Sequence, residues 1–238
     1  MSLIELPQEA SRLLKLDLNE EQQRAFERYS QALISWNERV NLTAIVEPLA
    51  IEIRHFLDSL SILKVAALPN NMRVIDVGAG AGFPGLPLKI VCPQINLTLL
   101  EATGKKTAFM QYVVDDLALT GVKIANVRAE DAGQDPAFRE NYDLVLARSV
   151  AHMPVLVEYL LPLCKVGGRC IAMKGESAAA EIALAEIALR LLGGHFLQLV
   201  PVELPHVAET HYLVIIEKIA ATPRQFPRKP GVPTKKPL

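Results

Sequence analysis

Apolar residues recur at helical spacing in the segment that begins after Asn19. They fall at Ala25, Phe26, Tyr29, Leu33 and Trp36, which is the repeat of one buried helix face. Asn19 precedes two glutamates and a glutamine, so it is placed to cap this helix. A connecting loop is expected from Trp36 to Thr43. A second helix is expected from Pro48 to about Val65, so the pattern predicts a helical extension over residues 1–66.

On that second helix, Arg54 and Asp58 stand one turn apart and are expected to pair. His55 lies beside them. A lone histidine in such a place is more typical of a packed surface residue than of a ligand, and this is the interpretation we give it.

From Arg73 onward, short apolar runs alternate with helical segments. We expect strands near 74–77, 95–100, 122–127, 143–147, 170–173, 196–202 and 212–218, and helices near 84–91, 105–119, 151–166 and 177–192. No helix separates the last two strands, so they are expected to form a hairpin-like pair at one edge of the sheet. The alternation predicts an α/β fold with a mostly parallel seven-stranded sheet that contains one antiparallel strand.

A glycine-rich corner follows the first strand, in the stretch RVIDVGAGAGFPG from Arg73 to Gly85. The string GAGFPG satisfies the dinucleotide pattern, which keeps an NAD-dependent oxidoreductase as an alternative. Counted from the end of the strand, however, the pattern begins at Gly78 and its third glycine position holds Phe83, whose ring would crowd a pyrophosphate. Asp76 stands two residues before the first glycine. An acid-x-Gly-x-Gly-x-Gly corner resembles the first motif of Rossmann-like S-adenosylmethionine-dependent methyltransferases.

Charged residues follow the later strands. Glu101 ends the second strand and is placed to accept both ribose hydroxyls of either cofactor, so it does not discriminate between them. Lys105 and Lys106 open the next helix against its macrodipole, which favours contact with a partner, although a solvated face explains them too. The fourth strand leads directly into Arg148.

Composition narrows the class of protein. The chain has 238 residues, half of them hydrophobic, which fits one domain or one domain with an appendage. Its net charge of −1 gives no support for a nucleic-acid partner, so such a partner must meet a local patch. The three scattered cysteines suit a reducing compartment and have no metal-ligand spacing. With neither a signal-peptide pattern nor a membrane-length apolar run, we expect a cytoplasmic protein without a metal or a membrane contact.

The last segment has a different character. From Pro223 to Leu238 it holds five prolines and no acid, and its five basic residues are Arg224, Arg228, Lys229, Lys235 and Lys236. Prolines keep such a segment extended, and its charges suggest phosphate contact. Two alternatives remain open: a disordered solubilising end, or a segment that packs across the core with Phe226 covering apolar surface.

Together these pieces resemble the bacterial 16S ribosomal RNA guanine-N7 methyltransferase family, historically called glucose-inhibited division protein B. The matching pieces cover nearly the whole chain: Trp36-Asn37, Asn41-Leu42-Thr43, Arg54-His55, Asp58-Ser59-Leu60, Asp76 to Gly85, Lys105-Lys106, Arg128-Ala129-Glu130, Arg148 to Ala151, Lys174-Gly175 and Arg228 to Leu238. The family more often has alanine where this chain has Ser149.

The resemblance implies a Rossmann-like fold, S-adenosylmethionine as cofactor, and methylation of a guanine in the 530 loop of 16S rRNA, either naked or in the small ribosomal subunit. It implies cofactor contacts at Gly78, Phe83, Glu101, Ala102, Thr103, Ala129, Glu130 and Arg148. The glycine corner itself adds Gly80 as a cofactor contact, and Arg148 is also a candidate catalytic, positioning residue. Candidate RNA contacts are Lys105, Lys106, Lys174, Arg228, Lys229, Lys235 and Lys236. We expect a monomer with a helical extension (1–66), a cofactor-binding methyltransferase domain (67–221) and a basic tail (222–238). The alternatives are the oxidoreductase and a non-enzymatic RNA-binding module.

Overall fold

The computed structural model describes residues 3–238, which begin with a group of helices. These are α1 (Leu6–Leu14), α2 (Glu20–Asn37), α3 (Pro48–Ile51), the π-helix η1 (Glu52–Leu57), α4 (Asp58–Leu60) and the 3₁₀-helix η2 (Ser61–Lys64). The predicted cap of α2 is confirmed. Asn19 accepts the backbone N–H of Gln22 at 2.9 Å, and the Gln22 side chain accepts that of Asn19 at 3.0 Å.

Seven strands follow: β1 (Arg73–Val77), β2 (Asn96–Leu100), β3 (Val122–Ala125), β4 (Tyr142–Arg148), β5 (Cys164–Lys174), β6 (Gly194–Val202) and β7 (His211–Lys218). Their order in the sheet is β3-β2-β1-β4-β5-β7-β6. The pairs among β1 to β5 are parallel, and β7 runs antiparallel to both β5 and β6. The predicted mostly parallel sheet, with one reversed strand and a terminal hairpin, is confirmed.

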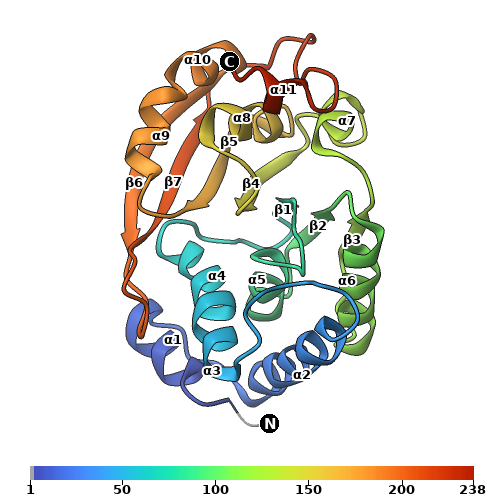
Figure 1. The fold of residues 1–238 in the computed structure, drawn as a ribbon, viewed down its shortest axis with the longest axis vertical. Helices are drawn as coiled ribbons and strands as arrows, with labels where there is room; N and C mark the ends of the chain where they lie inside the picture. The colour runs from blue at the N-terminus through green and yellow to red at the C-terminus, as the bar shows by residue number, and fades with distance from the viewer. Residues whose placement is uncertain (1–2) are drawn as a thin grey trace.

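Helices cover both faces of this sheet (Figure 1). The first group of helices packs on one face with α5 (Gly85–Val91) and α6 (Gly104–Asp116), where Val74 and Leu144 point. The other face, to which Ile75 and Val145 point, is covered by α7 (Ala129–Gln134), α8 (Met153–Leu160), α9 (Ala178–Leu184) and α10 (Glu186–Leu192). Successive strand residues alternate between the two cores, as a doubly covered sheet requires.

Three predicted elements have different bounds. The helix expected over 48–65 is divided into α-helical, π-helical and 3₁₀ turns. The helix expected over 151–166 ends at Leu160, because Pro162 has no N–H with which to continue it, and β5 therefore begins at Cys164 rather than Cys170. The helix expected over 177–192 divides at Ala185, whose N–H contacts the carbonyls of both Glu181 and Ile182.

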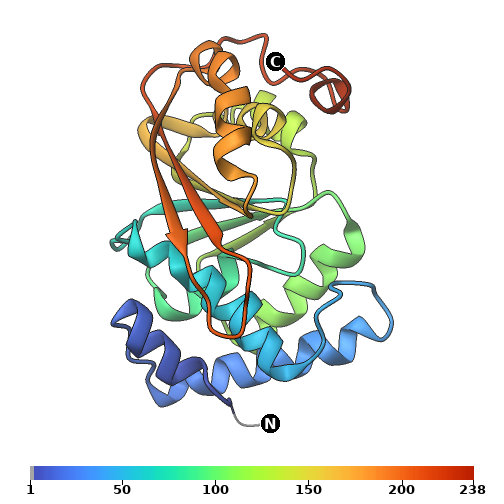
Figure 2. The ribbon, with the colours of Figure 1, turned by 60° about the vertical axis from the view of Figure 1, so that its left-hand side comes forward.

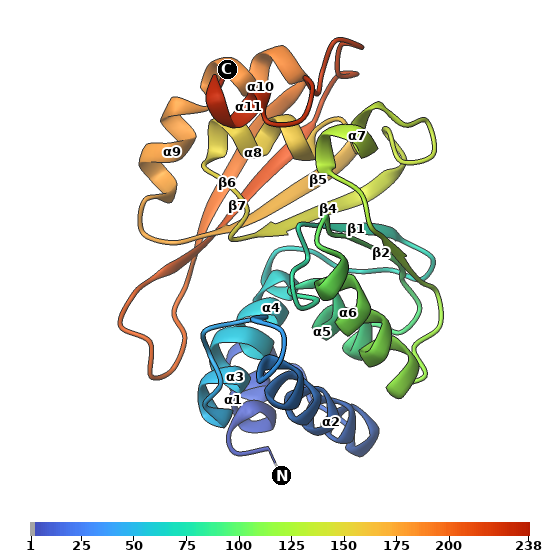
Figure 3. The same cartoon turned by 45° about the vertical axis from the view of Figure 1, so that its right-hand side comes forward.

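The β6–β7 hairpin extends beyond the sheet toward the first helices (Figures 2 and 3). At its tip, Nε2 of His206 lies 2.8 Å from a carboxylate oxygen of Glu5, just before α1. The hairpin therefore joins the helical extension to the far edge of the sheet. The start of β7 lies close to α4, where Nδ1 of His211 is 2.9 Å from a carboxylate oxygen of Asp58.

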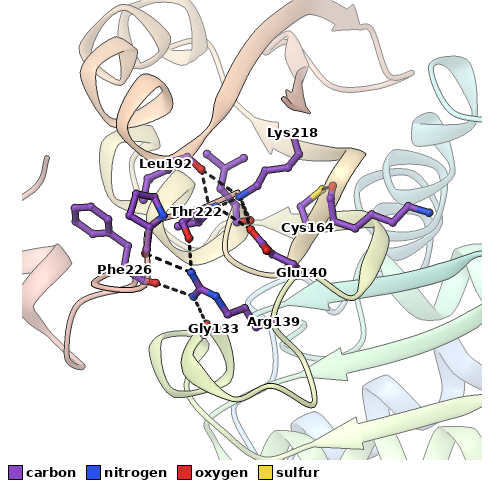
Figure 4. Close-up of polar contacts among 11 residues, drawn as sticks. Gly133, Arg139, Glu140, Cys164, Leu192, Lys218, Thr222 and Phe226 are labelled. Carbon is purple, nitrogen blue, oxygen red and sulfur yellow. Dashed lines mark hydrogen bonds and ion pairs between the residues drawn. The ribbon is translucent and has the colours of Figure 1, made fainter. Parts of the chain in front are cut away.

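The tail packs against the protein. Figure 4 shows the guanidinium of Arg139 donating to the carbonyls of Gly133, Thr222 and Phe226, at 2.6, 2.6 and 2.8 Å. Phe226 is buried, and the tail ends in the short helix α11 (Val232–Lys235). Of the three possibilities for this segment, packing across the core describes its conformation.

Candidate active site

A cavity of about 400 Å³ opens at the carboxyl edge of the sheet, where β1, β4 and β5 end. The sheet contributes the glycine corner, Arg148, Ser149 and residues 173–175; the helical extension contributes Leu42, Thr43, Ile45, Arg54, His55 and Asp58; α6 contributes Lys106 and β7 contributes His211. This is the edge at which open α/β sheets bind ligands, and the volume suits a small molecule.

Two glycines of the corner have different surroundings. Gly78 has φ +69°, and a Cβ there would lie 2.7 Å from a methyl carbon of Val150. Gly80 has φ +61°, and a Cβ there would meet only the carbonyl oxygen of Gly78, at 3.9 Å. Gly78 is therefore required for packing. Gly80 leaves its backbone open to a ligand in the cavity.

Two carboxylates lie beneath the corner. Glu101 is buried and accepts the backbone N–H groups of Gly80 at 3.0 Å and Thr103 at 2.9 Å, so its position relative to the corner is fixed. Asp76 accepts the N–H of Gly85 at 2.8 Å through Oδ2, while its Oδ1 is buried without a partner among the described residues. Burial raises the pKa of Asp76 to about 7.

Phe83 lines the cavity, and its ring contacts two other rings. Its ring stacks between Tyr29, at a centroid distance of 5.3 Å, and His55, at 4.5 Å. The guanidinium carbon of Arg148 lies 5.0 Å from the same ring. The bulky residue at the third glycine position therefore connects the corner to the helical extension.

Arg148 is held by the extension through several bonds. One terminal nitrogen donates to the Arg54 carbonyl at 2.9 Å and to Oδ2 of Asp58 at 3.0 Å; the other lies 3.2 Å from Nδ1 of His55. A guanidinium can only donate, so Nδ1 of His55 is the acceptor in this contact. The neutral ring therefore has its proton on Nε2, which donates to Oγ1 of Thr43 at 2.9 Å. Burial, with Arg148 nearby, lowers the pKa of His55 to about 3, so the imidazole is neutral.

Two expectations about this region were wrong. His55 is buried within the wall of the cavity rather than packed on the surface. Arg54 does not pair with Asp58, because the Asp58 side chain points inward to Arg148; Arg54 lies outward, 3.6 Å from Glu209.

Glu101 and the remaining candidate cofactor residues lie at the same edge without lining the cavity. Ala102 and Thr103 are exposed and directly follow Glu101. Ala129 and Glu130 begin α7, where buried Glu130 accepts the N–H of Gly231 from the tail at 3.0 Å. Their roles toward a cofactor stay predictions.

The candidate RNA-binding residues divide into two groups. Lys174 and Arg228 have internal partners: Lys174 lies 2.7 Å from Glu181, and Arg228 forms a forked pair with Glu158, whose side chain is fully buried. The other five are more accessible: Lys105 and Lys106 at the start of α6, and Lys229, Lys235 and Lys236 on the tail. Lys105 and Lys106 also border a second cleft with Arg39.

The sequence did not identify Thr43, Asp58 and His211 as parts of a site. Asp58 accepts from Arg148 and from Nδ1 of His211, at 2.9 Å. Thr43 and Asp58 lie in segments that match the family, and this match was the one sequence feature that could have identified them as site residues. No sequence feature indicated His211, because it reaches this edge only through the antiparallel direction of β7.

Comparison with solved structures defines the class of fold. A structure described as a SAM-dependent methyltransferase from Aquifex aeolicus matches with a TM-score of 0.53 and 16% identity, over 71% of this chain and 93% of that one. TrmN from Thermus thermophilus matches with a TM-score of 0.55 and 19% identity, over 81% and 53%. The fold is that of the Rossmann-like methyltransferases.

The sequence comparisons are more specific. Residues 22–208 match the GidB family model, described as rRNA small subunit methyltransferase G. Curated proteins named ribosomal RNA small subunit methyltransferase G are 49% identical in Roseiflexus castenholzii, over 94% of both chains, and 44% identical in Desulforamulus reducens, over 97% of this chain and 96% of that one. The chain belongs to the GidB family, an enzyme family, which sets aside the oxidoreductase and the non-enzymatic module.

Neither a membrane span nor a metal cluster is found among residues 3–238. In this part of the chain, no helix is long and apolar enough to cross a membrane. Over the same residues, no group of three or more histidine, cysteine, aspartate or glutamate side chains is arranged to hold a metal ion.

Proposed function

We propose that this protein transfers the methyl group of S-adenosylmethionine to N7 of a guanine in the 530 loop of 16S rRNA, acting as a monomer in the cytoplasm. The proposal rests on a cavity that is lined by both the open backbone of Gly80 and the fixed side chain of Arg148, in a chain of the GidB family. The family's description names small-subunit rRNA as the substrate class.

The corner fits the cofactor. A ligand can approach Gly80 without displacing a side chain, and the carboxylate of Glu101 is fixed beside it to accept ribose hydroxyls. Ala102, Thr103, Ala129 and Glu130 follow β2 and β3 on the side where the adenine would lie. When bound, the cofactor supplies a methyl group on a positively charged sulfur.

The chemistry requires orientation more than proton transfer. N7 of guanine carries an in-plane lone pair and no proton, so no general base is needed. The neutral His55 in the cavity wall therefore need not act as a base. We assign it the role of positioning Arg148, with which it is in contact. Holding the nucleophile in line with the methyl group can supply up to about 7–11 kcal/mol.

Arg148 must not donate to N7, because that would occupy the attacking lone pair. Its two terminal nitrogens already have partners in Asp58, His55 and the Arg54 carbonyl, which keeps them on the wall. Within the cavity it can hold the cofactor carboxylate, a phosphate or O6 of the guanine.

The proposal is tested by incubating the protein with labelled S-adenosylmethionine and either small ribosomal subunits or naked 16S rRNA. Label in one of the two substrates supports it and identifies the form that is used. Thermal melts with S-adenosylhomocysteine and with NAD provide an independent test of the cofactor. Stabilisation by NAD alone would contradict the proposal.

A further inference from the structure

One histidine at the rim of the cavity has two ring nitrogens with different surroundings. His211 begins β7, and its Nδ1 lies 2.9 Å from Oδ1 of Asp58. Among residues 3–238 its Nε2 forms no hydrogen bond, and the side chain is 28% exposed and lines the cavity. The proposed methyl transfer assigns no role to this residue.

The pairing with Asp58 determines what Nε2 can do. A carboxylate only accepts, so Nδ1 of His211 carries the proton of that bond. Nε2 is then an acceptor when the ring is neutral and a donor when it is protonated. Asp58 raises the pKa of His211, which favours the protonated form and a donor at Nε2.

The other charged groups around His211 come from several elements. Arg148 on β4 and Arg54 on η1 both oppose its protonation, and His55 is neutral. Glu209, in the same hairpin, lies near Arg54, while Lys174 on β5 is paired with Glu181. With His211 protonated, the rim holds three cations, Arg54, Arg148 and His211, against two carboxylates, Asp58 and Glu209. It therefore has an excess of positive charge beside the cavity.

We propose that His211 and Arg54 form a phosphate-binding subsite on this rim, which holds a phosphodiester of the rRNA strand next to the target guanine. The inference rests on the proposed function. Arg54 is suited to the role because its side chain is 40% exposed, lines the same cavity and lies no closer than 3.6 Å to its carboxylate partner. The subsite anchors the strand outside the cavity while the base enters it.

A general-base role would use the same histidine in its neutral form. N7 has no proton to remove, so a base has no task in this reaction. The two roles predict opposite pH profiles. A phosphate-binding cation predicts that subunit affinity falls as pH rises through the titration of His211, and a base predicts that turnover rises.

The test compares wild type with His211→Gln and His211→Arg, using small subunits that lack the modification. It measures subunit affinity, KM for methyl transfer, and affinity for S-adenosylhomocysteine. Removing one charge-assisted hydrogen bond should weaken subunit binding by about 10- to 100-fold in His211→Gln. His211→Arg should restore it to within about threefold and remove its decline with pH. His206→Gln, in the same hairpin but paired with Glu5, is the matched control and should change nothing.

Unchanged subunit affinity in a His211→Gln protein that still binds S-adenosylhomocysteine would overturn the subsite, as would turnover that rises with pH and is lost in His211→Arg. Binding and transfer are measured separately. A wild-type protein that binds subunits but transfers no methyl group would contradict the proposed function, while the comparison with His211→Gln would still decide the subsite.

Discussion

The guanidinium of Arg148 donates to the carboxylate of Asp58 at 3.0 Å across ninety residues of sequence. Arg148 ends β4 of the sheet, and Asp58 begins α4 of the helical extension. Both side chains are largely buried at the wall of the cavity. The extension is therefore part of the candidate active site. The wall of the cavity is held by an ion pair between one residue of the sheet and one of the extension.

Replacing Arg148 should affect both activity and stability. Among residues 3–238, Arg148→Ala leaves the buried carboxylate of Asp58 with His211 as its only ionisable partner, and breaking a buried pair costs about 3–5 kcal/mol. We expect methyl transfer to fall by orders of magnitude and the melting temperature to fall as well. Arg148→Lys, the matched variant, keeps the charge and should recover much of the stability but little activity. Near-normal turnover in either variant would show that Arg148 does not position the reactants.

A side chain at Gly80 should block the cofactor. Gly80→Leu places atoms in the open space beside the corner, and we expect at least tenfold weaker S-adenosylhomocysteine binding by calorimetry in a protein that remains folded. Gly167→Leu is the control: φ there is +83°, with nothing within 4 Å of the added Cβ, so the backbone strain is similar but far from the cavity. Equal affinity in the two variants would remove the corner from the site.

Asp76 should give the fold a measurable pH dependence. Its pKa is about 7 in the folded protein against 3.8 for the free side chain, so the folded state holds more protons between these values. The associated stability is complete below about pH 4 and is lost as pH rises through 7. From pH 5 to 8 the free energy of unfolding should drop by about 2–3 kcal/mol more in wild type than in Asp76→Asn. Parallel urea-derived profiles of the two proteins would contradict this.

The tail should contribute strongly to stability. Arg228→Ala leaves the fully buried carboxylate of Glu158 without its guanidinium, which should cost about 3 kcal/mol in the free energy of unfolding. Arg224→Ala removes the same charge from an exposed side chain and is the control. Truncation after Ala221 also removes acceptors of Arg139, so it should lower the melting temperature. Equal melting temperatures of the two point variants would show that the Arg228–Glu158 pair does not stabilise the fold.

Whether the tail also binds RNA is best tested without truncation. Replacing Lys229, Lys235 and Lys236 by alanine removes exposed charges only, so the melt should be unchanged. For every lysine that binds a phosphate in the wild type, its replacement should reduce the slope of log affinity against log salt by about 0.7 to 0.9. An unchanged slope would place the RNA-binding surface elsewhere, at Lys105 and Lys106.

The sequence predicted what local patterns determine. The alternation of apolar runs predicted the sheet. The glycines that follow Asp76 predicted the turn that lines the cavity. The environments of His55 and Asp58 could not be predicted, because both residues contact Arg148, which is distant in sequence. They also lie in or next to a π-helical turn that the sequence pattern did not predict. The packing of the tail likewise depends on Arg139 and Glu158, which become its partners only after folding.

The proposed methyl transfer is tested most directly by locating the methyl group on the rRNA. After reaction with unmodified small subunits, 16S rRNA is treated with borohydride and aniline, which cleave at 7-methylguanosine, and the break is mapped by primer extension. We expect one new break, at a guanine of the 530 loop, that depends on S-adenosylmethionine and is lost in Arg148→Ala. Label at another base or another ring atom, with no break in that loop, would contradict it.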